Sequence, residues 1–231
     1  MNAVFFDLFP LSVFQDKILL SQDEKKGIID YIFKIENETS NAEKVSKDDA
    51  WLGDRKGHEF LLKNSKFQKL EQLISEKIKL YIEMLDIESN KLDFFYQRSW
   101  ATITRKAERI KPHAHVQSNI SFAYYLHKPK NSGDLRFNTD PQNEIATGLF
   151  SGENVGLGLL KKVSLRNTSN ADVNIQEDDI IIFPSKTRHS TIPNQTEKPR
   201  ISISGDVIIM LKDSFGYEKL MPHYNNWQPF S

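Results

Sequence analysis

The chain contains no cysteine among its 231 residues. This absence excludes disulfides, thiolate nucleophiles and metal sites with cysteine ligands. Histidines and carboxylates remain as the side chains that could hold a metal ion, and a chain without thiols is compatible with a reducing compartment. The six histidines of the chain are therefore the residues on which a prediction of metal chemistry depends.

The chain also lacks an excess of charge of either sign. Lys and Arg total 31 and Asp and Glu total 31, so electrostatics gives no reason to expect nucleic acid or a membrane surface as a partner. No apolar run approaches the length of a membrane span. The apolar stretch Met1–Phe14 has no basic beginning and is interrupted by Asp7 and Pro10, which is unlike a signal peptide. We expect a cytoplasmic protein of one domain, residues 1–231.

The first part of the chain, residues 1–91, predicts a short strand and two supporting helices. Phe5–Phe14 is typical of an edge strand, where a proline is tolerated. Ser21 and Glu24 have the spacing of a capping box, which predicts the start of a helix. A second helix is predicted over Ser65–Met84, because its apolar residues repeat at helical spacing. The polar stretch 36–54 is expected to be a loop.

From residue 92 the pattern changes to short β-branched and aromatic runs separated by turn residues. The predicted strands are Phe94–Thr104, Ile120–His127, Asp134–Phe137, Lys162–Leu165, Ala171–Ile175, Asp179–Phe183, Ser190–Ile192 and Ile201–Leu211. Helices followed by many short strands favour a mostly β fold with flanking helices (α+β). We expect a jelly roll over residues 92–211 with the N-terminal helices packed on one sheet.

Two further segments have their own expectations. The glycine-rich stretch Asn143–Gly158 shows no strand pattern and is predicted to be a mobile insertion. Such loops on a β-sandwich are commonly lids or substrate loops, and the sequence does not show whether this one closes over the site. The aromatic tail, residues 212–231, is expected to pack back on the domain.

The histidines form a pattern that is split between two parts of the chain. His113 and His115 are two positions apart, so in an extended segment both imidazoles lie on the same face. His189 follows the predicted strand Asp179–Phe183 after a short turn, and Arg200 precedes the next strand. Imidazoles are suitable ligands for iron, and three ligands on one face of the ion leave coordination positions open for other molecules. A guanidinium can bind a carboxylate through two parallel hydrogen bonds. The pattern predicts a mononuclear Fe(II) site with a dicarboxylate co-substrate.

The other histidines favour ordinary structural roles. His58, His127 and His223 lie beyond a polar loop, at a strand end and in the tail, where surface or capped histidines are common. The alternative for the His113–His115 pair is two strand-edge histidines without a metal.

Six short blocks between Trp100 and Val207 strengthen the metal reading. They are His113-Ala114-His115, Ser121–Leu126, Gly133–Phe137, Phe183-Pro184-Ser185, His189 with Pro193-Asn194, and Arg200–Ser204. In this combination the chain resembles the 2-oxoglutarate-Fe(II) oxygenases, and among them a family of marine phages and bacteria that is akin to the prolyl hydroxylases. The segment Phe5–Phe14 also resembles the start of that family.

The resemblance implies a cupin-like double-stranded β-helix and a set of site residues. It places the iron ligands at His113, His115 and His189. It places the arginine that pairs with the distal carboxylate of 2-oxoglutarate at Arg200, and hydroxyls that help to hold this carboxylate at Ser202 and Tyr125.

Tyr124 and Tyr125 cannot both contact the carboxylate of 2-oxoglutarate. Neighbouring side chains of a strand point to opposite faces, so at most one of the two tyrosines reaches the ligand.

One feature departs from the superfamily. Most members have His-x-Asp or His-x-Glu where this chain has His-x-His, and a neutral imidazole does not neutralise a charge of the iron. Bound 2-oxoglutarate, a dianion, could balance a site of three histidines. Alternatively, one histidine of the pair lies outside the iron shell and a carboxylate enters from elsewhere, with Asp134 as the first candidate and Asp140 as the second. A turn residue after Gly133 is the more favoured role for Asp134.

The resemblance implies hydroxylation of a C–H bond with Fe(II), 2-oxoglutarate and O2, and ascorbate as a further candidate cofactor. The acceptor would be a peptidyl proline, another protein side chain or a small metabolite. Two other classes stay open: a cupin-like metal-binding protein without oxygenase activity, and a structural phage component. Arg200 favours the oxygenase over the first of these, because a protein that only binds metal does not need this arginine, and a structural component would bind iron only weakly.

Overall fold

Two β-sheets and two long helices form the framework of the computed structural model, which describes residues 3–39, 48–54, 57–138, 145–213 and 220–230. The strands are β1 (Phe14–Lys17), β2 (Trp51–Leu52), β3 (Leu92–Thr104), β4 (Ile120–His127), β5 (Leu135–Asn138), β6 (Asn170–Val173), β7 (Asp179–Pro184), β8 (His189–Thr191) and β9 (Arg200–Leu211). The helices are α1 (Gln22–Thr39), α2 (Gln68–Met84) and the short α3 (Glu153–Gly156). A six-stranded sheet has the order β1-β7-β4-β9-β3-β2, and a three-stranded sheet has the order β6-β5-β8.

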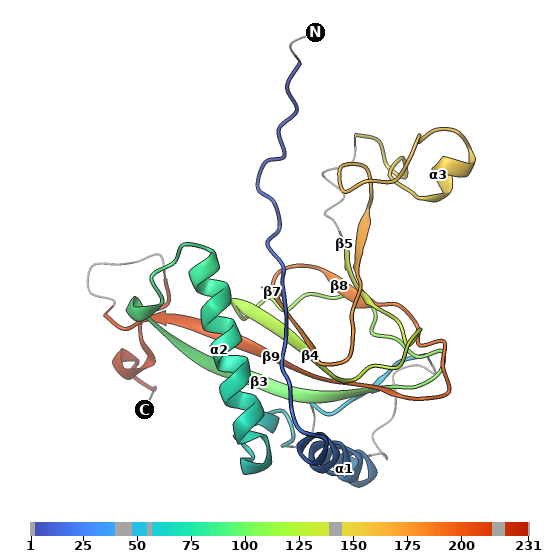
Figure 1. Cartoon of the computed structure of the whole chain (residues 1–231). Coiled ribbons are helices and arrows are strands. Elements are labelled where there is room, and N and C mark those ends of the chain that lie inside the picture. Colours follow the sequence, from blue (N-terminus) through green and yellow to red (C-terminus); the bar gives the residue numbers. More distant parts are fainter. Residues whose placement is uncertain (1–2, 40–47, 55–56, 139–144, 214–219, 231) are drawn as a thin grey trace.

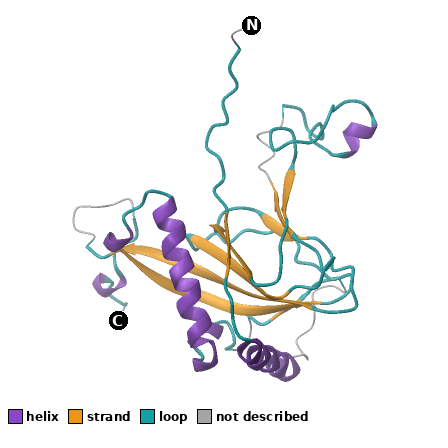
Figure 2. Cartoon of the chain, in the orientation of Figure 1, coloured by secondary structure: helices purple, strands orange, loops and turns teal. Residues whose placement is uncertain are grey.

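The long helices cover one face of the six-stranded sheet, as Figure 1 and Figure 2 show for α2. Ile32 of α1 and Ile74 of α2 are fully buried in one cluster with Ile201 and Ile203 of β9. The opposite face of the sheet contributes to a second, smaller cluster that includes side chains of the three-stranded sheet. The predicted mostly β fold with helices packed on one sheet is confirmed.

The predicted helices are confirmed together with their start signals. The backbone N–H of Ser21 donates to the Glu24 carboxylate at 2.7 Å, and the backbone N–H of Glu24 approaches the Ser21 hydroxyl at 3.3 Å. This reciprocal pair is the capping box that the sequence predicts for α1. A turn of 3₁₀ helix at Ser65–Phe67 leads directly into α2, which ends at Met84 as predicted.

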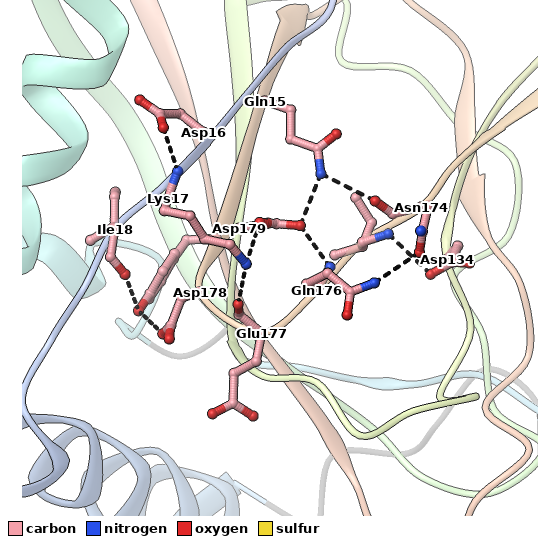
Figure 3. A network of polar contacts seen from close by, with 12 residues as sticks. Gln15, Asp16, Lys17, Ile18, Asp134, Asn174, Gln176, Glu177, Asp178 and Asp179 are labelled. Carbon is pink, nitrogen blue, oxygen red and sulfur yellow. Dashed lines mark hydrogen bonds and ion pairs between the residues drawn. The ribbon is translucent and has the colours of Figure 1, made fainter.

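The first strand lies later in the chain than predicted. β1 begins at Phe14, whereas Phe5 in the preceding segment is 73% exposed. Gln15 Nε2 donates to the Asp179 carboxylate at 2.9 Å, and Lys17 Nζ lies 2.7 Å from the other oxygen of Asp179 (Figure 3). These side chains fix the edge strand against β7, so hydrophobicity alone pointed to the wrong stretch.

One other prediction about the strand region needs correction. No strand forms at Lys162–Leu165, because Asn167 closes a turn there by accepting the backbone N–H of Ser164 at 2.6 Å. The predicted loop 143–158 contains α3 in its described part and projects from the body of the molecule (Figure 1). Residues 143 and 144 lie outside the described residues.

The loop predicted over residues 36–54 is shorter than expected. Helix α1 continues to Thr39, and β2 forms at Trp51–Leu52 by pairing with β3. Residues 40–47 of this stretch lie outside the described residues.

The tail contacts the body through His223, whose Nε2 lies 3.3 Å from the Asp93 carboxylate. None of the helices in the described part of the chain combines the length and the apolar character needed to cross a bilayer.

Candidate active site

A cavity of about 420 Å³ opens beside the face of the six-stranded sheet that is turned away from the long helices. Its wall combines residues of both sheets. Among the lining residues are all six of the predicted site residues: His113, His115, Tyr125, His189, Arg200 and Ser202.

Backbone hydrogen bonds bring the two distant halves of the histidine pattern together. The N–H of His113 donates to the carbonyl of His189 at 2.9 Å, and the N–H of His189 donates back to the carbonyl of His113 at 2.8 Å. The N–H of His115 donates to the carbonyl of Ser185 at 2.9 Å. The segment before β4 is thus attached to the turn between β7 and β8, which the sequence pattern alone does not specify.

The three imidazoles converge. Their ring centroids are separated by 5.0 Å for His113 and His115, 4.3 Å for His113 and His189, and 5.3 Å for His115 and His189. One nitrogen atom from each ring can be chosen so that all three lie within 4.8 Å of one another. This spacing fits three ligands of a single metal ion.

Each imidazole uses its Nδ1 atom for a hydrogen bond. In His113 and in His189 this atom lies 2.8 and 2.9 Å from the carbonyl oxygen two residues earlier in the chain. In His115 it lies 2.5 Å from a carboxylate oxygen of Asp206. Carbonyl and carboxylate oxygens accept, so Nδ1 carries a proton in each ring and Nε2 is the nitrogen left to face a metal.

The surroundings keep two of these rings neutral. Burial lowers the pKa of His113, and burial together with the neighbouring His113 lowers the pKa of His189 to about 3. Metal binding requires neutral imidazoles, and burial favours this form of His113 and His189 in the metal-free protein.

β9 presents a row of polar side chains to the cavity. Arg200, Ser202, Ser204 and Asp206 all line it, while the isoleucines between them belong to the core under the helices. This is the period-two alternation of a strand. Sequence reasoning missed Asp206, although this residue continues the alternation of Arg200, Ser202 and Ser204 by one more step of two positions.

Arg200 is a buried cation at this wall, with 2% of its surface exposed. Its guanidinium donates to the carbonyls of Ser132 and Gly133 at 2.7 and 2.8 Å and to the hydroxyl of Thr191 at 2.9 Å. Burial lowers its pKa, but an arginine keeps its charge in proteins. No carboxylate of the described residues forms an ion pair with it, so its charge is available to a ligand in the cavity.

Tyr125 and Ser202 have hydroxyls that make no hydrogen bond within the described chain, and both residues line the cavity. Burial raises the pKa of Tyr125 to about 12, so the phenol stays protonated and can donate. Tyr124 points to the opposite face, where its hydroxyl lies 3.1 Å from the Asp178 carboxylate. The expected split between the two tyrosines is what the structure shows.

Asp134, the first carboxylate considered as an alternative ligand, does not belong to the cluster of imidazoles. Asp134 lies 3.2 Å from Lys128 Nζ and accepts the backbone N–H of Ile175 at 3.3 Å, and Figure 3 shows it near Asn174 and Gln176. Asp140 lies outside the described residues. Turn and loop structure is therefore the role that the contacts of Asp134 support.

Residues 98–206 match the model of a family described as "Putative 2OG-Fe(II) oxygenase", where 2OG is 2-oxoglutarate. The resemblance to the 2OG-Fe(II) oxygenases is confirmed over this stretch. The matched part of the chain contains the three histidines, Arg200, Ser202, Tyr125 and, as its last residue, Asp206. No curated protein matches the sequence significantly.

Solved structures share the fold of this chain. The alpha ketoglutarate dependent epimerase SnoN from nogalamycin biosynthesis is 14% identical, with 92% of this chain and 89% of SnoN covered and a TM-score of 0.54. AviO1 from Streptomyces viridochromogenes Tue57 is 12% identical, with 86% and 90% covered and a TM-score of 0.52. HygX from Streptomyces hygroscopicus, solved with nickel and 2-oxoglutarate, is 11% identical, with 85% and 82% covered and a TM-score of 0.51. These similarities confirm the double-stranded β-helix, and at such identities they show the fold alone.

Proposed function

We propose that this oxygenase hydroxylates a C–H bond of its acceptor and that His113, His115 and His189 hold the Fe(II). The observation that carries the assignment is the set of hydrogen bonds at the three Nδ1 atoms. Because each Nδ1 donates to an acceptor, the three Nε2 atoms are the ones left for one metal ion. Three imidazoles suit iron and leave coordination positions for a co-substrate and oxygen.

We assign the distal carboxylate of 2-oxoglutarate to Arg200, Ser202 and Tyr125. Arg200 is buried without a carboxylate partner among the described residues, and a buried cation is costly unless it is paired. The free hydroxyls of Ser202 and Tyr125 lie on the wall of the same cavity. A cupin-like protein that only binds metal would have no use for this set.

The protein residues have three tasks in this reaction. When bound, Fe(II) and 2-oxoglutarate supply the activation of O2 and the loss of CO2 that leaves succinate. The histidines orient the metal, and the Arg200 cluster orients the co-substrate. Phe183 and Leu135 line the cavity with apolar surface that excludes water from the reacting groups.

A charged pair lines the cavity in which the acceptor would bind. Arg98 donates to the Asp54 carboxylate at 2.7 Å, and its guanidinium lies 4.9 Å from the ring centre of Trp100. All three residues line the cavity, together with Val116, which is largely exposed. We propose a peptidyl side chain as acceptor, with proline first because of the resemblance to prolyl hydroxylases, and another side chain or a small metabolite as the alternatives.

The test is an anaerobic titration of the metal-free protein with Fe(II) and 2-oxoglutarate, followed through the charge-transfer band in the visible spectrum. The band should appear only with both components and should weaken in Tyr125→Phe but not in Tyr124→Phe, the same change on the opposite face. Prolyl peptides are then added with O2, and succinate and hydroxylated peptide are measured. Iron binding without a band would overturn the co-substrate assignment, and absence of iron binding would overturn the metal site.

A further inference from the structure

Asp206 is a buried carboxylate, 4% exposed, in the middle of the six-stranded sheet. In the register of β9 it lies opposite Ser121 of β4 on one side and Arg98 of β3 on the other. Its Oδ1 atom is 2.5 Å from Nδ1 of His115 and accepts the Ser121 hydroxyl at 2.7 Å. The carboxylate therefore contacts one of the three proposed iron ligands directly.

The contact is part of a set of bonds that fixes the His115 ring. The Ser121 hydroxyl, which holds Asp206, also lies 2.9 Å from the hydroxyl of Ser185, a fully buried residue. The carbonyl of that same Ser185 accepts the backbone N–H of His115. On another side the ring lies 5.7 Å from the Trp100 ring, measured between centroids. The main chain of His115 is thus held by the turn after β7, and its imidazole is held by β9.

His115 is singled out among the three histidines. The Nδ1 atoms of His113 and His189 face neutral backbone carbonyls, whereas that of His115 faces a carboxylate. Among the described residues Asp206 forms no ion pair with Lys or Arg, and neighbouring Arg98 pairs with Asp54 instead. The negative charge of Asp206 therefore acts mainly on the His115 ring.

We infer that Asp206 is a positioning residue of the metal centre, which holds His115 in its ligating tautomer and lends it the negative charge that a His-x-Asp site would place directly on the iron. The inference rests on the proposed function of the three histidines. A carboxylate that accepts from the far nitrogen of a ligand makes that imidazole a stronger donor to the metal. The effect is large in a buried site, where charges are poorly screened.

The test compares two equally conservative substitutions at buried aspartates. Asp206→Asn removes the charge next to His115, and Asp179→Asn removes the charge of a residue that is 3% exposed but pairs with Lys17 at the sheet edge (Figure 3). Co(II) and Fe(II) dissociation constants are measured anaerobically on the full chain, with unfolding of the metal-free protein in parallel. We expect Asp206→Asn to weaken metal binding by about 10- to 100-fold. Asp179→Asn should lower stability and leave the metal affinity unchanged.

A spectroscopic readout separates electronic from purely structural effects. A metal with a weaker donor at His115 holds its electrons more tightly, so the Fe(II)–2-oxoglutarate band of Asp206→Asn should move to shorter wavelength. Unchanged metal affinity and band position would overturn the inference while the metal site of the wild type stands. If the wild-type protein bound no metal, the proposed function itself would fail and the inference with it.

A second variant keeps the test decisive if Asp206→Asn does not fold. Ser121→Ala removes the hydroxyl that holds Asp206 and leaves every proposed iron ligand in place. It should weaken metal binding in the same direction by a smaller factor, and wild-type affinity in this variant would then count against the inference.

Discussion

His113 and His189 lie opposite one another and exchange both of their backbone hydrogen bonds, at 2.9 and 2.8 Å. The bonds are independent of the side chains, so the two segments stay together when an imidazole is removed. Metal binding and folding can therefore be tested separately at this site.

His189→Ala and His113→Ala should each lose metal binding without losing the fold. Removal of one of three ligands should weaken Fe(II) or Co(II) binding by more than about 100-fold, because the loss of an outer hydrogen bond to a ligand already costs about 10- to 100-fold. His127→Ala is the matched control, since His127 does not line the cavity and its Nδ1 lies 3.1 Å from the Glu177 carboxylate. Anaerobic metal titrations and circular dichroism decide. Equal affinities in the His189 and His127 variants would contradict the ligand assignment.

Tyr125→Phe and Ser202→Ala should weaken 2-oxoglutarate binding and leave stability nearly unchanged. Neither hydroxyl has a partner in the described chain, so its removal leaves no buried group unsatisfied. A hydrogen bond to a charged group contributes about 1.5–3 kcal/mol, which predicts a loss of about 10- to 100-fold per hydroxyl. Co-substrate titration of the metal-bound protein gives this number.

Tyr124→Phe is the control for that experiment, with the opposite expectation. Its hydroxyl contacts Asp178 and the carbonyl of Ile18, so its loss should lower the melting temperature and leave co-substrate affinity intact. The reverse outcome, a co-substrate defect in Tyr124→Phe alone, would mean that the two faces of β4 had been assigned wrongly.

Gly133→Ala should damage both stability and co-substrate binding. Gly133 has φ +87°, and a Cβ there would lie 2.0 Å from the Ile192 carbonyl oxygen and 2.9 Å from a guanidinium nitrogen of Arg200. The left-handed backbone costs a non-glycine residue about 1–3 kcal/mol, and overpacking costs about as much again. Thermal unfolding and 2-oxoglutarate titration measure the two effects.

Gly158→Ala separates conformational strain from the clash. Gly158 also has positive φ, at +73°, but a Cβ there meets nothing within 4 Å. This variant should show only the smaller backbone penalty and no change in co-substrate affinity. If Gly158→Ala were as unstable as Gly133→Ala, close packing around Arg200 would not be the cause of the instability of Gly133→Ala.

The sequence predicted most of the site because strand periodicity and residue chemistry are local properties. Two histidines that are two positions apart in an extended segment must share a face, and so must Arg200 and Ser202, wherever these segments lie in the fold. β4 has the predicted bounds, and β9 begins one residue before its predicted start.

The parts that sequence reasoning missed depend on contacts between distant segments. The position of β1 is set by Gln15 and Lys17 meeting Asp179, not by the apolar residues before it. The contact of Asp206 with His115 becomes evident only when β9 is placed beside β4 and the segment of His115. From the sequence alone, a single aspartate in an apolar strand is indistinguishable from a residue on the surface.

The metal-free protein should lose stability when the pH falls below about 6.5. Burial and then the nearby His113 lower the pKa of His189 to about 3, against an ordinary value of 6.5 for the unfolded chain. Between these two values the unfolded state binds a proton that the folded state refuses, so stability rises with pH and falls on acidification. One such proton changes the free energy of unfolding by about 1.4 kcal/mol per pH unit, and the lowered pKa of His113 acts in the same direction. Urea unfolding at pH 7.0 and at lower pH gives the slope for wild type and for His189→Gln, in which it should be smaller by up to one proton. Identical slopes would mean that His189 takes up its proton equally in both states, and that the site is not the dry, neutral cluster that metal binding requires.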